Sequence, residues 1–225
     1  MRMRRKSRLD ERVKECGKHL LKIEGEDFYK IPEEERFDYI DFNEVFGNDL
    51  PLMLEIGCGK GGFAFCHSKK YPEVNFIAVE KISNVVIEAC ERADREQPAN
   101  LRFMNVSAEN LPFYIKNHTV KRIYLNFSCP YPKYTYRNRR LTYYRFLDIY
   151  KKLLTDDGEI FLKTDNRHFF EFSLQSLSEN GFCLKNISLD LHSDDYTDNI
   201  ETEYEKMFVA QGKPIYRLEA YIPRN

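Results

Sequence analysis

Apolar runs alternate with segments of helical periodicity from residue 51 to near the end of the chain. Short apolar runs predict strands, whereas apolar residues spaced three and four positions apart predict helices. The predicted strands cover residues 52–56, 74–79, 101–106, 122–127 and 159–163, followed by two β-rich segments at 182–190 and 215–222. The predicted helices cover residues 62–70, 82–96, 139–153 and 166–180, with a short helix before residue 117 and a turn at Asp157 and Gly158.

This alternation is typical of an α/β fold with a mostly parallel sheet and helices on both faces. In such folds, ligands bind beyond the carboxyl ends of the strands. Those ends carry the segments 55–62, 105–107 and 127–133, the single residue Glu80, and the pair Thr164 and Asp165. The topology therefore predicts that these segments form one site.

The length of 225 residues suits one domain with a sizeable core. No uncharged apolar run approaches the roughly 18 residues of a membrane span. The basic opening, residues 1–6, is not followed by the apolar stretch of a secretory signal. The six cysteines lack CxxC spacing and the five histidines lack HxxxH spacing, so we expect reduced thiols, a cytoplasmic protein and no metal site.

A net charge of −1 gives no global reason to expect a nucleic-acid partner, but the charge is unevenly distributed. Residues 1–22 hold nine basic and three acidic side chains, whereas residues 186–205 hold seven acidic side chains and no Lys or Arg. Between them, segment 133–140 interleaves cations with rings. Its cations are Lys133, Arg137, Arg139 and Arg140, and its rings are Tyr134 and Tyr136. Single-stranded or looped RNA would suit this mixture, and a solvated loop before a helix would account for it equally.

A glycine-rich turn follows the first predicted strand. Gly57, Gly59 and Gly62 satisfy GxGxxG, and the acid Glu80 follows the next strand, as in sites where a carboxylate binds a ribose. NAD is one candidate ligand for this pattern. Glu55 argues against it, because a carboxylate beside the turn would repel a pyrophosphate and attract a cationic amino or sulfonium group. The pattern therefore favours S-adenosylmethionine, with Glu80 on its ribose.

Short motifs are spread in order over nearly the whole chain. They are MRMR at 1–4, VFGN at 45–48, EIGCGKGGF at 55–63, YLNFS at 124–128, PYPK at 130–133, RRLT at 139–142, FLKTDNR at 161–167, TEYE at 202–205 and GKPIYR at 212–217. Together they resemble the bacterial tRNA (guanine-N7)-methyltransferases. The resemblance implies a class I, Rossmann-like methyltransferase fold over residues 41–225, preceded by a basic arm and helix over residues 1–40. It implies methyl transfer from S-adenosylmethionine to N7 of a guanine in the tRNA variable loop, usually position 46.

The same resemblance assigns site residues. The cofactor-binding positions of the family fall on Glu55, Gly57, Gly59, Glu80, Ser107 and Cys129, and the substrate-binding positions fall on Lys133, Asp165, Thr202 and Glu205. The RNA-binding loop falls on Arg137, Arg139 and Arg140. We expect tRNA as the partner, with no membrane and no metal, and either a monomer or a homodimer.

Two positions depart from the family pattern. Ser107 replaces an acid on the adenine side of the cofactor, and Cys129 replaces the aspartate proposed to be catalytic. Guanine N7 has an in-plane lone pair and no proton, so its methylation needs positioning and charge stabilisation rather than a general base. A thiol with an ordinary pKa of about 8.5 is mostly neutral at pH 7. Three interpretations therefore stand: a divergent tRNA guanine-N7 methyltransferase, a weak or inactive paralogue that binds cofactor or RNA, or a methyltransferase with another target.

Overall fold

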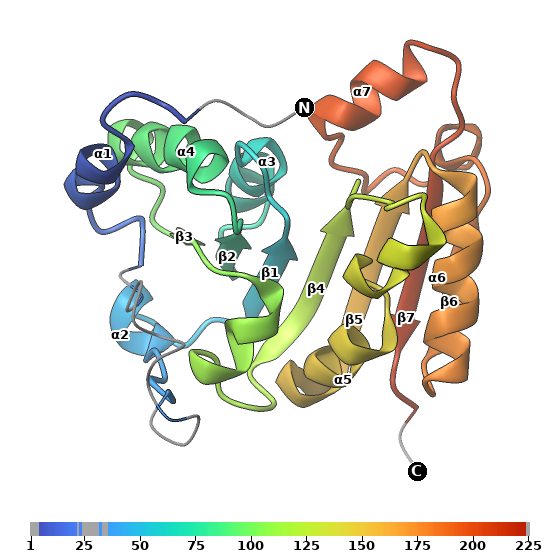
Figure 1. The fold of residues 1–225 in the computed structure, drawn as a ribbon, viewed down its shortest axis with the longest axis horizontal. Helices are drawn as coiled ribbons and strands as arrows, with labels where there is room; N and C mark the ends of the chain where they lie inside the picture. The colour runs from blue at the N-terminus through green and yellow to red at the C-terminus, as the bar shows by residue number, and fades with distance from the viewer. Residues whose placement is uncertain (1–4, 22, 24–31, 33–35, 224–225) are drawn as a thin grey trace.

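Seven strands form a single sheet in the computed structural model, which describes residues 5–21, 23, 32 and 36–223 (Figure 1). The order across the sheet is β3-β2-β1-β4-β5-β7-β6. The strands are β1 (Leu52–Ile56), β2 (Asn75–Val79), β3 (Leu101–Met104), β4 (Val120–Asn126), β5 (Leu154–Thr164), β6 (Cys183–Ser188) and β7 (Tyr216–Tyr221). Only β7 runs antiparallel to its neighbours, β5 and β6. The predicted mostly parallel seven-stranded α/β sheet, with helices on both faces, is confirmed.

Two helices precede the first strand, and the others lie in the connections between strands (Figure 1). They are α1 (Leu9–Glu15), α2 (Phe42–Phe46), α3 (Gly62–Lys70), α4 (Ser83–Glu96), α5 (Tyr144–Leu153), α6 (Arg167–Glu179) and α7 (Glu203–Val209), with the 3-10 helices η3 (Ala108–Phe113), η4 (Tyr134–Arg139) and η5 (Leu191–Ser193). The predicted helix over 139–153 begins later, at Tyr144, because the basic segment before it forms η4 and then an extended residue, Arg140.

Alternating side chains along β4 divide the core between the two faces of the sheet. Ile123 and Leu125 belong to the apolar cluster that contains the buried side chains of α5 and α6. Tyr124 belongs to a second cluster, with Phe63 of α3 and Ala89 of α4. Both faces of the central strands are thus buried, which fixes the carboxyl ends of these strands in space.

The strand β5 begins earlier than its apolar pattern indicates. Its pairing with β4 advances from Leu154 opposite Val120 to Glu159 opposite Arg122, so residues 155–158 form an irregularity inside the strand. The predicted turn at Asp157 and Gly158 falls within this interruption. A local signal was therefore present, although the strand continues through it.

The N-terminal arm is packed on the domain over its described residues. Lys6 forms an ion pair with Glu88, and Arg12 forms one with Glu91, both on α4. Further along, Leu20 makes a parallel bridge with Phe103 of β3. The predicted arm cations Arg2, Arg4 and Lys22 lie outside the described residues. Part of the basic charge of the arm is consequently neutralised by acids of the domain.

Gly61 offers a test of how tightly the glycine-rich turn is packed. Its φ is +77°, and an added Cβ would lie 3.1 Å from both Ala89 and the Phe103 ring. Gly181 has a φ of +79° and open space around that position. Gly181→Ala should cost only the left-handed strain, about 1–2 kcal/mol. Gly61→Ala should cost a further ~1–3 kcal/mol from overpacking. Urea unfolding of both variants measures the difference, and equal losses would refute it.

Candidate active site

The glycine-rich turn after β1 is held against the end of β2. The backbone N–H groups of Gly57 and Cys58 both donate to the carbonyl of Val79, at 2.8 and 3.0 Å. Gly57 and Gly59 have φ values of +85° and +59°, and nothing lies within 4 Å of an added Cβ at either position. The turn thus needs glycine for its backbone conformation and leaves open space on its outer side.

Glu80 is fixed at the start of α4. Its carboxylate accepts hydrogen bonds from the backbone N–H of Gly59 at 3.3 Å and of Ile82 at 2.9 Å. The residue is only 9% exposed, so it is not an ordinary surface acid. Beside it, Asn105 donates to the Glu80 carbonyl and accepts from the Ser83 hydroxyl. The carboxylate therefore has a defined place next to the glycine-rich turn.

Glu55 is the most unusual acid of the site, because it is buried at the end of β1 with a single hydrogen bond. Asn126 of β4 donates to its Oε1 at 3.0 Å, while Oε2 has no hydrogen-bond partner among the described residues. Burial raises the pKa of Glu55 to about 7, although Asn126 and the charge of Lys163 act in the opposite direction. A buried acceptor without a donor is costly in free energy, and a cationic ligand would relieve that cost.

Thr202 and Glu205, predicted to bind substrate, are used inside the protein. The Thr202 side chain accepts from the Glu205 backbone N–H, and the Glu205 carboxylate accepts from the Thr202 backbone N–H, which makes a capping box at the start of α7. Glu205 is fully buried and pairs with Lys163 of β5 at 2.6 Å. Lys163 was not among the predicted site residues, although a lone lysine in the apolar run of a central strand is a usable signal.

The remaining predicted site residues lie in loops above the sheet. Cys129 is an exposed free thiol in the loop after β4, and Lys133 is exposed just before η4. Asp165 follows β5 and lies 3.6 Å from the Lys213 ammonium. Ser107 precedes η3 and gives it no side-chain cap. Phe127 and Asp165 follow neighbouring parallel strands, so these loops start from the same edge of the sheet.

The loop around Cys129 has a constrained backbone. Phe127 and Tyr131 have φ values of +49° and +41°, a left-handed conformation that is uncommon for large side chains. The backbone N–H of Phe127 donates to the carbonyl of Lys163 at 2.8 Å, and the Phe127 ring stacks on Phe208 of α7 at 5.9 Å. Strained backbone of this kind concentrates at functional sites.

The basic and aromatic residues of segment 133–140 form cation–π pairs. The Arg137 guanidinium lies 3.8 Å from the Tyr134 ring centre, and that of Arg139 lies 4.7 Å from Tyr136. Arg140 differs, because its guanidinium donates to the carbonyls of Pro130 and Tyr131 and lies over Phe172. In this segment, Arg140 therefore braces the loop that carries Cys129, while the other cations remain on the surface.

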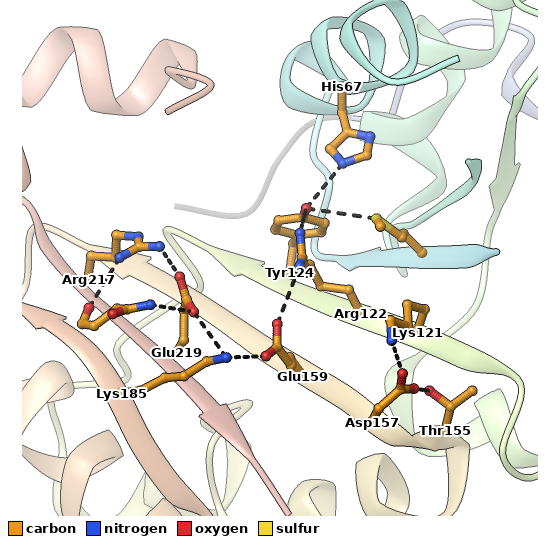
Figure 2. A network of polar contacts seen from close by, with 12 residues as sticks. His67, Lys121, Arg122, Tyr124, Thr155, Asp157, Glu159, Lys185, Arg217 and Glu219 are labelled. Carbon is orange, nitrogen blue, oxygen red and sulfur yellow. Dashed lines mark hydrogen bonds and ion pairs between the residues drawn. The ribbon is translucent and has the colours of Figure 1, made fainter. Parts of the chain in front are cut away.

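A cavity lined in part by His67, Arg122, Tyr124 and Arg217 adjoins the site on the α3 side of β4 and β5. Figure 2 shows the polar contacts of these residues: His67 is hydrogen-bonded to the Tyr124 hydroxyl at 3.1 Å, and Arg122 lies between Tyr124 and Glu159. Lys185 pairs with Glu159, and Arg217 pairs with Glu219. Burial lowers the pKa of His67 to about 3, so this imidazole is neutral. Each of these three cations has a carboxylate partner, although Arg122 and Lys185 share Glu159.

Neither a metal site nor a membrane-spanning helix is found in the described part of the chain. It contains no group of three or more His, Cys, Asp or Glu side chains placed to hold a metal ion. Its helices include none that is long and apolar enough to cross a membrane.

A family model described as "Putative methyltransferase" matches residues 49–218. The tRNA (guanine-N(7)-)-methyltransferase of Geobacillus kaustophilus (strain HTA426) is 47% identical over 182 residues, which cover 81% of this chain and 84% of that protein. The protein of the same name from Bacillus cytotoxicus (strain DSM 22905 / CIP 110041 / 391-98 / NVH 391-98) is 40% identical over 220 residues, which cover 98% of this chain and 96% of that one.

Solved structures resemble the chain at the level of fold. The 16S rRNA methyltransferase KamB matches with a TM-score of 0.62 at 13% identity, covering 83% of this chain and 95% of that one. An antibiotic-related methyltransferase matches with a TM-score of 0.59 at 16% identity, covering 81% and 95%. These likenesses support the class I methyltransferase fold. Given the family model and relatives at this identity over most of its length, the chain belongs to the tRNA (guanine-N(7)-)-methyltransferase family.

Proposed function

We propose that this protein transfers the methyl group of S-adenosylmethionine to N7 of a guanine in tRNA, at position 46 of the variable loop. The observation that carries the proposal is the buried Glu55 carboxylate, whose Oε2 has no partner among the described residues, beside an open glycine-rich turn. A ligand with an ammonium and a sulfonium group satisfies such an acceptor, whereas a dinucleotide pyrophosphate does not. The names of the relatives supply the substrate and the reacting atom.

Different residues of the site would bind the cofactor and the guanine. Glu55 would hold the amino-acid end of the cofactor, and Glu80, fixed beside Gly59, would hold its ribose. The bound cofactor supplies an activated methyl group. Because guanine N7 needs no deprotonation, the protein has to orient the base and stabilise the charge that develops on it. Lys133, in the loop between β4 and η4, and Asp165, directly after β5, would help to hold that base.

The surface beside the site fits RNA locally. Lys133, Arg137 and Arg139 combine charge with the rings of Tyr134 and Tyr136, which suits phosphates and unstacked bases. Arg140, predicted to bind RNA, instead donates to loop carbonyls, so we expect its contribution to come through the shape of the loop. The free thiols suit a cytoplasmic protein. The division into an arm over residues 1–40 and a methyltransferase domain remains a prediction, and so does a monomeric or homodimeric state.

A second candidate function is favoured by the loop after β4. Cys129 stands in place of the aspartate of the family, and Ser107 stands in place of an acid on the adenine side of the cofactor. A paralogue that binds cofactor and RNA with little or no transfer would show both features, and so would a methyltransferase with another target. The difference is one of rate and target, and it can be measured directly.

The proposed function predicts incorporation of label into tRNA. Purified protein incubated with methyl-labelled S-adenosylmethionine and unmodified tRNA should yield N7-methylguanine, located by mass spectrometry of nuclease fragments. A matched tRNA with adenine at position 46 should remain unlabelled. Cofactor binding without any labelled tRNA would support the inactive paralogue, and label at another base would support a different target.

The raised pKa of Glu55 predicts pH-dependent cofactor binding. Protonation removes the negative charge that attracts the ligand ammonium, so affinity should fall as the pH drops through about 7. Between pH 8 and 6 the ionised fraction falls from about nine-tenths to about one-tenth, and affinity for S-adenosylhomocysteine by calorimetry should fall about tenfold. Glu55→Gln should bind weakly and retain only the titration of the ligand itself. Identical pH profiles for both proteins would exclude this role of Glu55.

The cysteine that stands at position 129 in place of an aspartate predicts a gain of function. Cys129→Asp should raise kcat on tRNA by at least tenfold and up to about 10², because one well-placed charge can be worth that much in a transition state. Cys129→Asn, of the same size without the charge, is the control and should not show this gain. Single-turnover rates at saturating cofactor provide the measurement. A loss of activity in the aspartate variant would mean that the thiol has an adapted role.

A further inference from the structure

Lys163 connects β5 to the loop before α7 and to α7 itself. Its ammonium donates to the side-chain oxygen of Asn199 at 2.9 Å, to the carbonyl of Ile200 at 2.9 Å and to the Glu205 carboxylate at 2.6 Å. An ammonium has three N–H donors, so each of them is used. The side chain is 8% exposed and also lies near enough to Glu55 to lower the pKa of that acid. Lys163 thus stands between the cofactor side of the site and α7.

The Glu205 carboxylate is contacted by four hydrogen-bonding groups of the protein itself. Lys163 and the backbone N–H of Thr202 approach Oε2, while Asn199 at 2.5 Å and His192 at 3.0 Å approach Oε1. Burial disfavours its charge, yet the Lys163 ammonium and these hydrogen bonds hold the pKa of Glu205 below its usual range. A carboxylate offers about four acceptor sites. With all four occupied, Glu205 has none left for a guanine edge.

The helix that Glu205 anchors lies across the site. Glu203 is near the glycine-rich turn, since its Oε1 would be 3.4 Å from a Cβ added to Gly62. On the same helix, Phe208 stacks on Phe127 at 5.9 Å and on Tyr204 at 6.4 Å, which joins α7 to the loop that carries Cys129. The α7 helix therefore lies against both the glycine-rich turn and the loop after β4.

Only seven residues make up α7, which is too short a helix to be stable by itself. It buries few apolar side chains: Tyr204, Met207 and Val209 are exposed, at 60%, 44% and 36%. Its position must therefore come from its first turn, where the capping box and the ion pair to Lys163 are located. Loss of that pair would leave a buried charge without its partner, which is strongly destabilising.

We propose that Lys163 is a positioning residue, and that the Lys163–Glu205 pair is a buried latch that sets α7 over the site. The Thr202–Glu205 motif then acts on the substrate through the position of α7, and not by contact with the guanine. The side chain that α7 offers to RNA is Tyr204, the exposed end of the ring stack that leads to Phe127. The assignment of a substrate rests on the proposed function, whereas the latch itself does not.

The test compares Lys163→Met, Glu205→Gln and the double variant. Glu205→Gln keeps the size of the side chain and one acceptor oxygen while it removes the charge, so it is the milder of the two single changes and should fold even if Lys163→Met does not. The matched control is Lys185→Met, which removes a lysine paired with Glu159 on the same sheet but away from α7. The readouts are hydrogen exchange of residues 199–209, the Kd for S-adenosylhomocysteine, and KM and kcat on tRNA.

The latch predicts a specific pattern. Either single variant should speed hydrogen exchange in residues 199–209 at least tenfold. Each should also lower kcat/KM on tRNA by up to about 10², mainly through KM, because a small displacement of the groups that position a substrate is costly. Cofactor Kd at pH 8 should change less than about threefold in Glu205→Gln, whereas Lys163→Met should weaken cofactor binding more, because the Lys163 charge lowers the pKa of Glu55. The double variant should be no worse than the poorer single variant, since both break one interaction. Lys185→Met should leave all of these values unchanged.

Direct contact of Glu205 with guanine predicts a different result. Glu205→Gln would then lower kcat with unchanged exchange in residues 199–209, and Lys163→Met would not reproduce its effect. That outcome would overturn the latch. If the wild-type protein methylated no tRNA, the proposed function would fail, while exchange and cofactor binding would still decide whether the latch exists.

Discussion

The buried contact between Lys163 and Glu205 is the interaction on which the arrangement of the site depends. Charges removed from water need partners, and these two side chains, 42 positions apart, neutralise one another between β5 and α7. The same ammonium also offsets part of the burial cost of the Glu55 carboxylate. Removing the Lys163 charge would therefore disturb the cofactor side and the substrate side together, although the two sides are built from distant parts of the chain.

The periodicity of apolar residues and the glycine spacing were sufficient to predict the sheet, its mostly parallel pairing and the position of the glycine-rich turn. These features follow from local rules: strands and helices alternate, glycines permit positive φ, and ligands gather at the carboxyl ends of strands. Glu55 and Glu80 could be selected because each lies next to a strand end, Glu55 one residue before the end of β1 and Glu80 directly after β2. Their burial and their partners lie beyond what a local pattern contains, and the single hydrogen bond of Glu55 became visible only in three dimensions.

Residues whose partners are distant in sequence were harder to interpret. Glu205 and Arg140 matched motifs that implied ligand contacts, yet both side chains are engaged by groups of the protein itself. Lys163 was overlooked because its importance comes from a loop and a helix that fold back onto β5. The net positive charge of the N-terminal arm could likewise be counted from the sequence. The ion pairs of Lys6 and Arg12 with acids of α4 could not be predicted from it.

The bridge between Leu20 and Phe103 bears on the solubility of the protein. β3 is an outermost strand of the sheet, and an uncovered outer strand presents backbone donors and acceptors to which another chain can add. The arm occupies part of that edge: Leu21 donates to the carbonyl of Phe103, and Phe103 donates to that of His19. A segment first noticed for its positive charge thus also blocks edge-to-edge association between copies of the sheet.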